Sequence, residues 1–219
     1  MSNDGCQRID IIGKSSHLIK LKQPAISHMR LFLAIELPDS VHDFLKQVRN
    51  SFSVQEREAN GLVSWVRAEN WHITLKFLGE VEPSRITALT STLEMVRIEP
   101  IDLFGGHIQY FPTRGPVNVI SIGLGGDIGR LNELHEQIEL RCKNIGFPTE
   151  GRAYTGHITI GRTKKIAAHS ATKRLRQIKF SELFPGPKFT VQSFVLMQSE
   201  LDARGSRYTT LARFPLFKS

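Results

Sequence analysis

The sequence predicts an α+β fold in which helices pack on the outer faces of mainly antiparallel sheets. The first observation is a pattern of His, Ile, Thr and an aliphatic residue that occurs twice, at 72–75 and at 157–160. The second is the order of elements, strand, helix, strand, helix, strand, which nearly repeats along the chain. Together they indicate an internal duplication with one motif in each half.

The first half opens on a continuous apolar run, which is typical of a strand buried on both faces. Asp39 or Ser40 is suited to cap the helix that follows, and Pro83 to open the next one. The expected elements are a strand at 30–35, a helix through Phe52, a polar loop at 55–61, a short strand at 64–67, the motif strand at 72–78 and a helix with its last apolar residue at Val96.

The second half has similar signals. Gly105-Gly106 marks an irregularity in its first strand, and Gly146 is a suitable stop for its long helix. The expected elements are strands at 103–111 and 117–124 around a turn at 112–116, a helix at 129–144, the second motif strand, a basic helix at 168–178, a turn at 185–187, a strand at 189–197, a loop at 202–206 and a strand at 208–214.

The two motifs carry groups suited to chemistry on a phosphate. Side chains alternate along a strand, so His72 and Thr74 share one face, as do His157 and Thr159. One neutral and one protonated imidazole form a general base and a general acid, and hydroxyls donate hydrogen bonds to phosphate oxygens. If the copies face each other, the site needs no metal and no other cofactor.

The composition is compatible with a protein that binds nucleic acid. The net charge of +8 favours a polyanionic partner, although a merely soluble basic protein has the same charge. Two cysteines give no disulfide framework, no apolar run is long enough for a membrane helix, and no secretory signal is evident. We therefore expect a cytoplasmic protein without membrane contact.

Several sequence stretches resemble the two-histidine (2H) phosphoesterases, specifically the RNA 2′,3′-cyclic phosphodiesterase family once called 2′-5′ RNA ligases. The stretches are RLFLAIELPDSV, WVRAENWHITLKFLGEV, YFPTRGP, GHITIGR and VLMQSELDARGSRYTTLARFPL. The resemblance covers Met29 to Phe217, while residues 1–28 have no clear period and are expected to form a flexible extension. Gly156 departs from the family, which often has proline there, and Ile120-Ser121 replaces a frequent tryptophan.

This resemblance implies a single bilobal domain at 29–219, with pseudo-twofold symmetry, two sheets around a central cleft and no metal. It implies that His72 is the proton donor, that His157 is the proton acceptor, and that Thr74 and Thr159 bind the phosphate. The reaction would open a 2′,3′-cyclic phosphate, at an RNA end or in a cyclic nucleotide, to a 2′-phosphomonoester. The protein is expected to act as a monomer.

Further candidates have ordinary structural alternatives. Arg162, five positions after His157, can bind phosphate at the cleft rim or be a solvated strand-end residue. Lys76 continues the His72 face, so it can reach an anion or be a charge at the sheet edge. The aromatic residues that can stack a base are more often core residues, and two arginines are plausible RNA contacts. These residues are Trp65, Phe111 and Tyr154, and Arg67 and Arg114.

Two other motifs fail on spacing. A zinc-protease helix would need histidine at position 139, which is Glu139, and a dinucleotide fingerprint would need glycine at position 128, which is Ile128. Two functions compete with hydrolysis: joining of RNA ends by the reverse chemistry, and RNA binding without turnover. The abundance of water favours hydrolysis, and a paired acid and base would be superfluous in a pure binding module.

Overall fold

The structure is a computed structural model, and it describes residues 28–55, 63–164, 168–178, 182–203 and 205–217. Along the chain, β1 (Met29–Glu36), α1 (Asp39–Gln55), β2 (Val63–Trp65), β3 (His72–Val81) and α2 (Ile86–Leu93) come first, with short 3-10 helices at Ala68–Asn70 and Pro83–Arg85. They are followed by β4 (Ile101–Phe111), β5 (Val119–Gly126), α3 (Ile128–Asn144), β6 (His157–Thr163), α4 (Ala168–Leu175), β7 (Lys188–Val191), β8 (Ser193–Asp202) and β9 (Gly205–Pro215).

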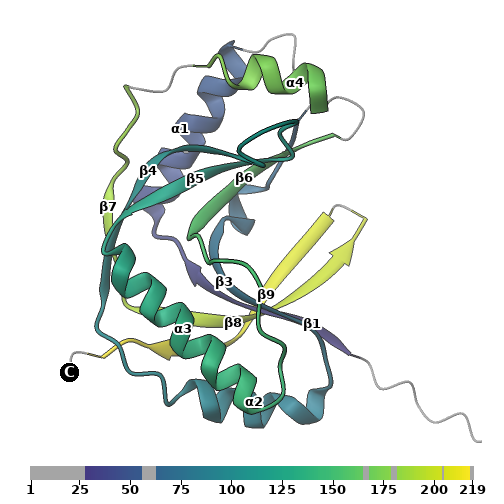
Figure 1. Ribbon diagram of the computed structural model, residues 1–219, viewed down its shortest axis with the longest axis vertical. Coiled ribbons are helices and arrows are strands. Elements are labelled where there is room, and N and C mark those ends of the chain that lie inside the picture. The colour runs from purple at the N-terminus through teal and green to yellow at the C-terminus, as the bar shows by residue number, and fades with distance from the viewer. Residues whose placement is uncertain (1–27, 56–62, 165–167, 179–181, 204, 218–219) are drawn as a thin grey trace, which may run out of the picture.

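The strands form one curled sheet with helices outside it, which confirms the α+β prediction (Figure 1). The two sheets that were expected are joined into this one sheet where β3 pairs with β6. Its order is β7-β4-β5-β6-β3-β1-β8-β9, with β2 added beside β6. Neighbouring strands are antiparallel throughout. The order is symmetric about the β6–β3 contact, because β5 and β1 flank the motif strands and each leads into a 17-residue helix. The sheet thus has a first half, β3-β1-β8-β9, and a second half, β7-β4-β5-β6 with β2, and the two halves meet at the motif strands.

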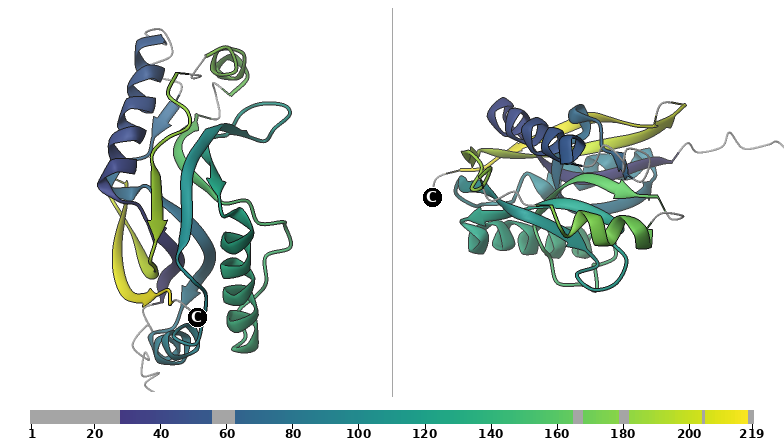
Figure 2. Two further views of the ribbon diagram at one scale, coloured as in Figure 1. Left: turned by 90° about the vertical axis from the view of Figure 1, so that its left-hand side faces the viewer. Right: turned by 90° about the horizontal axis from the view of Figure 1, so that it is seen from above.

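The two long helices cross to the opposite halves. Helix α1 follows β1 but packs on the second half, where a Cβ added at Gly105 of β4 would lie 2.8 Å from the ring of Phe44. Helix α3 follows β5 but packs on the first half, where Glu139 meets Lys76 of β3. Figures 1 and 2 show the two helices on the outside of the curled sheet. Each half is therefore completed by a helix from the other.

The segment 189–197, predicted as one strand, is two strands. Strand β7 pairs with β4 at one edge of the sheet, and β8 pairs with β1 on the far side of the motif strands. Gln192 lies between them, and its carbonyl accepts a hydrogen bond from the backbone of Leu216. The prediction was wrong because the apolar, buried residues continue on both sides of Gln192, so the sequence shows no break where the chain passes from one half of the sheet to the other.

The motif strands carry matching β-bulges. In β3, Ala34 of β1 lies opposite Thr74 and Leu33 lies opposite Lys76, so Leu75 is an extra residue. In β6, the same shift falls at Ile160, because Ser121 of β5 lies opposite Thr159 and Ile120 lies opposite Gly161. An extra residue inverts the alternation of the side chains that follow it. The residues after the bulge, Lys76 and Gly161, therefore face the core, and the next ones, Phe77 and Arg162, face the cleft.

The predicted anion contact of Lys76 is wrong for this reason. Its side chain is 1% exposed, its Nζ lies 2.6 Å from Oε1 of Glu139, and it donates a second hydrogen bond to the carbonyl of Pro148 at 2.8 Å. A buried ammonium requires such partners because it has left water.

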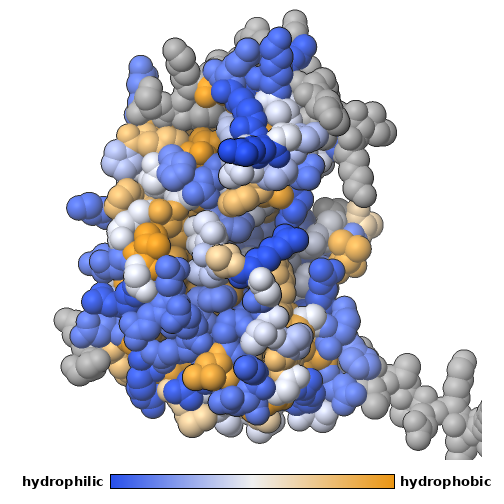
Figure 3. Space-filling view, in the orientation of Figure 1, coloured by the Kyte–Doolittle hydropathy of each residue, from blue (hydrophilic) through white to orange (hydrophobic). Residues whose placement is uncertain are grey.

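The described helices lack the length and apolar character required to cross a membrane. In the space-filling view, hydrophilic residues cover most of the visible face, and apolar residues form separate small patches (Figure 3).

Replacing Lys76 with Met should destabilise the fold by about 3 kcal/mol, because it leaves the carboxylate of Glu139 buried without its partner. The double variant Lys76→Met/Glu139→Leu should recover most of the loss. Urea unfolding measures both. The matched control is Lys46→Met, which breaks the solvent-exposed pair with Asp43 and should hardly move the midpoint. Equal effects for the two single variants would contradict the structural role of the buried pair.

Candidate active site

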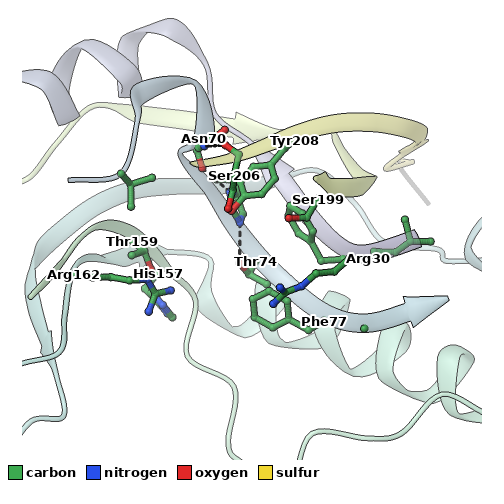
Figure 4. A pocket seen from close by; sticks show the side chains of 15 residues that line it. Arg30, Asn70, Thr74, Phe77, His157, Thr159, Arg162, Ser199, Ser206 and Tyr208 are labelled. Atoms are coloured by element: carbon green, nitrogen blue, oxygen red, sulfur yellow. Dashed lines mark hydrogen bonds between the residues drawn. The ribbon is translucent and has the colours of Figure 1, made fainter. Parts of the chain in front are cut away.

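The twin motifs lie next to each other on neighbouring antiparallel strands. Ile73 of β3 lies opposite Ile158 of β6, and both side chains are fully buried. The flanking motif side chains therefore point to the other face of the sheet. There they line a cleft of about 430 Å³, together with Arg162 (Figure 4). The four motif residues predicted to share a site are His72, Thr74, His157 and Thr159, and they do share it.

Both imidazoles are held in the same way. Nδ1 of His72 lies 2.7 Å from the carbonyl oxygen of Asn70, and Nδ1 of His157 lies 2.8 Å from that of Thr155. A carbonyl oxygen only accepts, so each Nδ1 carries a proton. Nε2 is then the nitrogen free to exchange a proton, and in His72 it lies 3.0 Å from Oγ1 of Thr74.

The two histidines differ in their surroundings. The ring of His72 lies between aromatic neighbours, 5.0 Å from that of Phe32 and 5.4 Å from that of Tyr208. Burial lowers the pKa of His72 below its ordinary value; the hydrogen bond to the Asn70 carbonyl opposes this shift, and the charge of His157 adds to it. His157 has a single such ring neighbour among the described residues, Phe111, at 5.2 Å. A neutral His72 is therefore favoured in the free protein.

A bulge brings Arg162 into the cleft. By strict alternation, a residue five positions after His157 would face away from it, but the extra residue Ile160 restores the cleft side. Its counterpart in β3 is Phe77, which also lines the cleft and is 60% exposed. The corresponding positions therefore carry a cation in one half and an aromatic ring in the other.

Other predicted RNA contacts lie outside the cleft. The ring of Tyr154 stacks on His135 at 4.1 Å, and its hydroxyl donates to the carbonyl of Thr74 at 3.1 Å. Burial raises the pKa of Tyr154. Its predicted stacking on a base is wrong, because the ring packs on His135 on the face of β3 that is opposite the cleft. Trp65 packs against Phe52, with 5.2 Å between ring centroids.

The predicted arginine contacts are also placed differently. The guanidinium of Arg67 donates to the carbonyl of Ser206 at 2.5 Å and pairs with Glu69 at 3.5 Å, so it braces β9. Arg114 is exposed in the loop between β4 and β5. Neither lines the cleft.

Sequence reasoning missed much of the cleft wall. Asn70 supports His72 with its carbonyl, and its side chain donates to the Ser206 carbonyl at 2.7 Å. The hairpin β8–β9 and the start of β1 supply the rest of this wall, namely Arg30, Phe32, Ser199, Ser206 and Tyr208. The alternation of side chains along β1 could have placed Arg30 and Phe32 on the cleft face. The hairpin lies at the cleft only because β8 pairs with β1, and the sequence does not reveal that order of strands.

Gly156, where relatives often have proline, has a local explanation. A Cβ at this position would lie 2.6 Å from a methyl group of Leu131. The glycine therefore lets the segment before β6 pass close to helix α3.

Comparisons with known proteins agree with this geometry. A family model described as "2'-5' RNA ligase superfamily" matches residues 37–203. The chain belongs to the 2′-5′ RNA ligase superfamily. This confirms the resemblance to two-histidine phosphoesterases, to which the rest of the comparisons also points.

Two relatives match over nearly their full length. An RNA 2′,3′-cyclic phosphodiesterase of Methanocaldococcus jannaschii is 30% identical over 187 residues, which are 84% of this chain and 98% of the relative. One of Archaeoglobus fulgidus is 29% identical over 188 residues, 85% and 99% of the two chains.

Solved structures share the fold. The protein TT0787 of Thermus thermophilus is 25% identical, with a TM-score of 0.70 over 86% of this chain and 98% of that one. LigT of E. coli, solved in complex with 3′-AMP, is 24% identical, with a TM-score of 0.67 over 87% and 99% of the two chains.

The pKa of His72 in the free protein should lie below about 6.5, the ordinary value for histidine. Between the lowered pKa and that value the unfolded chain binds more protons, so the stability contributed by the neutral ring is lost as pH falls through this window. Proton NMR of the imidazole measures the midpoint directly.

Unfolding at pH 7 and pH 5 tests the linkage. Because the pKa of His135 is also lowered by burial, His72→Gln should reduce the acid sensitivity of the free energy of unfolding without abolishing it. A titration midpoint of His72 at or above about 6.5 would contradict the prediction.

Proposed function

We propose that this chain hydrolyses RNA ends carrying a 2′,3′-cyclic phosphate to 2′-phosphomonoesters, with His72 and His157 as the acid–base pair. The observation that carries the proposal is the matched setting of the imidazoles, each with Nδ1 bound to a carbonyl and Nε2 left to exchange a proton. The activity named for the relatives supports the same substrate class.

The reaction needs one proton accepted and one proton donated. Nε2 of His157 takes a proton from water as the water oxygen bonds to phosphorus, and the bond from phosphorus to the 3′ oxygen breaks. Nε2 of His72 gives a proton to the departing 3′ oxygen, which becomes a hydroxyl. The phosphate stays on the 2′ oxygen. Transfer of the proton from His157 to solvent, and of one from solvent to His72, restores the starting states.

The different surroundings of the histidines support these roles. His157 has fewer aromatic neighbours, which suits the activation of water, whereas His72 is largely shielded from water beside Phe32 and Tyr208. Although burial lowers the pKa of His72, a phosphate anion near Nε2 would favour the imidazolium and raise that pKa. Substrate binding would thus prepare His72 to donate.

Threonine and arginine side chains complete the phosphate site. Hydroxyls of Thr74 and Thr159 and the guanidinium of Arg162 all line the cleft. Fixed donors stabilise the non-bridging oxygens, whose negative charge increases in the transition state. These donors supply what a metal ion would otherwise provide, so we propose that catalysis is metal-independent.

The reverse reaction, which joins a hydroxyl-ended RNA to the cyclic end, would use the same groups, but water is the more abundant nucleophile. The matched imidazoles argue against a binding module without turnover. The monomeric state and the cytoplasmic location stay predictions.

His72→Ala and His157→Ala should each lower kcat on a cyclic phosphate by ~10²–10⁴-fold while the protein stays folded. Loss of both should cost much less than the product, because the groups act as one unit. Thr74→Val and Thr159→Val should cost less, since each removes a donor and no proton transfer.

The rate against pH should be bell-shaped in the wild type and lose one limb in each histidine variant. The control is His42→Ala, outside the cleft, which should retain the wild-type rate. Near-wild-type turnover by either catalytic variant would rule out the two-histidine mechanism.

Activity should also survive a chelator. The proposed chemistry uses imidazoles and hydroxyls, so excess EDTA should leave the initial rate on cyclic-ended RNA unchanged. Phosphorus NMR should identify the product as a 2′-phosphomonoester. Loss of activity that zinc or manganese restores would overturn metal independence while leaving the substrate assignment open.

A further inference from the structure

A second cavity flanks the site on the His157 side. Its volume is about 460 Å³, close to the 430 Å³ of the cleft, which is the size of a small-molecule site. Strand β4 and the end of helix α4 supply most of its wall. The wall includes His107, Gln109, Phe111, Thr155 and Arg176.

This cavity adjoins His157, which lines the cleft. The ring of Phe111 lines it and lies 5.2 Å from the ring of His157. Thr155, whose carbonyl accepts the Nδ1 proton of His157, lines it as well. A chain whose end reacts at His157 therefore reaches this cavity by passing Phe111.

The charges of the flanking cavities give the chain a direction. The cavity beside His157 is lined by His107 and Arg176, and the described residues around it include no carboxylate. A third cavity, of about 300 Å³ behind His72, is lined by Glu36 and Glu69. RNA carries a negative charge at every phosphate, so the flank with Arg176 attracts it. On the other flank, Glu36 and Glu69 already pair with Arg213 and Arg67, so that flank offers RNA little attraction.

Gln109 lines the same cavity, and its side-chain oxygen is an acceptor without a partner among the described residues. This oxygen, Oε1, is buried. The amide nitrogen lies 3.3 Å from Nε2 of His107. A Cβ at Gly123 would lie 2.3 Å from that amide nitrogen, so the glycine leaves room for this side chain. A buried acceptor without a donor is costly, and rotation of the amide toward the cavity would let an N–H group of a nucleobase satisfy it.

We propose that this cavity is a second nucleotide subsite, which binds the nucleotide preceding the cyclic-phosphate end in the same RNA chain. The face of Phe111 stacks against that nucleotide, Arg176 attracts its phosphate, and Gln109 accepts from its base. The proposal rests on the proposed function and adds a consequence: the enzyme prefers oligonucleotides to cyclic mononucleotides.

The test compares kcat/KM for adenosine 2′,3′-cyclic phosphate with kcat/KM for the RNA dinucleotide ApA that ends in a 2′,3′-cyclic phosphate. Because one stacked base contributes measurably to binding, the wild type should prefer the dinucleotide by roughly fivefold or more. Gln109→Leu removes the acceptor at similar volume, and Arg176→Gln removes the charge. Each should lower the ratio of the two kcat/KM values toward one.

Two further variants make the result specific. His107→Ala, at an exposed position on β4, should also lower the ratio and keeps the test valid if Arg176→Gln unfolds. Glu69→Gln, on the acidic flank, should keep or raise the ratio. Melting temperatures identify variants that fail to fold.

The outcomes separate this proposal from the proposed function. Hydrolysis of both substrates by the wild type at equal kcat/KM, or an unchanged ratio in folded Gln109→Leu and His107→Ala, would overturn the subsite alone. Failure of the wild type to hydrolyse the cyclic mononucleotide and the dinucleotide would overturn both proposals.

Discussion

The contact between β3 and β6 is the constraint on which the rest of the molecule depends. Ile73 and Ile158 face each other at the centre of the sheet, and both are fully buried. Because side chains alternate along a strand, burying these two residues turns the neighbouring histidines and threonines to the open face. A polar replacement at either isoleucine would disturb the core and the site together.

The exchanged helices stabilise this contact from outside. Helix α1 covers the half that contains β4 and β5, and α3 covers β3 through the buried pair of Glu139 and Lys76. Neither half has its own long helix as cover, so the halves are expected to fold as one unit. The hydroxyl of Tyr154 adds a link beneath the site, since it donates to the backbone of Thr74, while the other face of the strand carries the proposed catalytic side chains.

The sequence was sufficient wherever a short-range period decides the structure. Alternation predicted the placement of His72, Thr74, His157 and Thr159, and helical spacing found α1 and α3. Prediction failed at the bulge after Thr74, because one extra residue reverses the face of Lys76 and no local signal marks it. It failed again at Gln192, where the chain crosses between halves within one apolar stretch. Asn70 went unnoticed because it supports His72 through its backbone carbonyl, and its side chain binds the distant carbonyl of Ser206.

Two histidines with the same backbone support but different side-chain neighbours are suited to a reaction that needs an acid and a base. The backbone repeats the same support for both imidazoles, a carbonyl two residues upstream bound to Nδ1. The side chains then break the symmetry: Phe32 and Tyr208 enclose His72, while His157 borders the cavity beyond Phe111. The residues that the bulges turn toward the cleft differ in the same way: Phe77 on the first motif strand is aromatic, and Arg162 on the second is a cation. In the proposed mechanism, symmetry of the backbone places the two Nε2 atoms that exchange protons, and asymmetry of the side chains favours one histidine as the donor and the other as the acceptor.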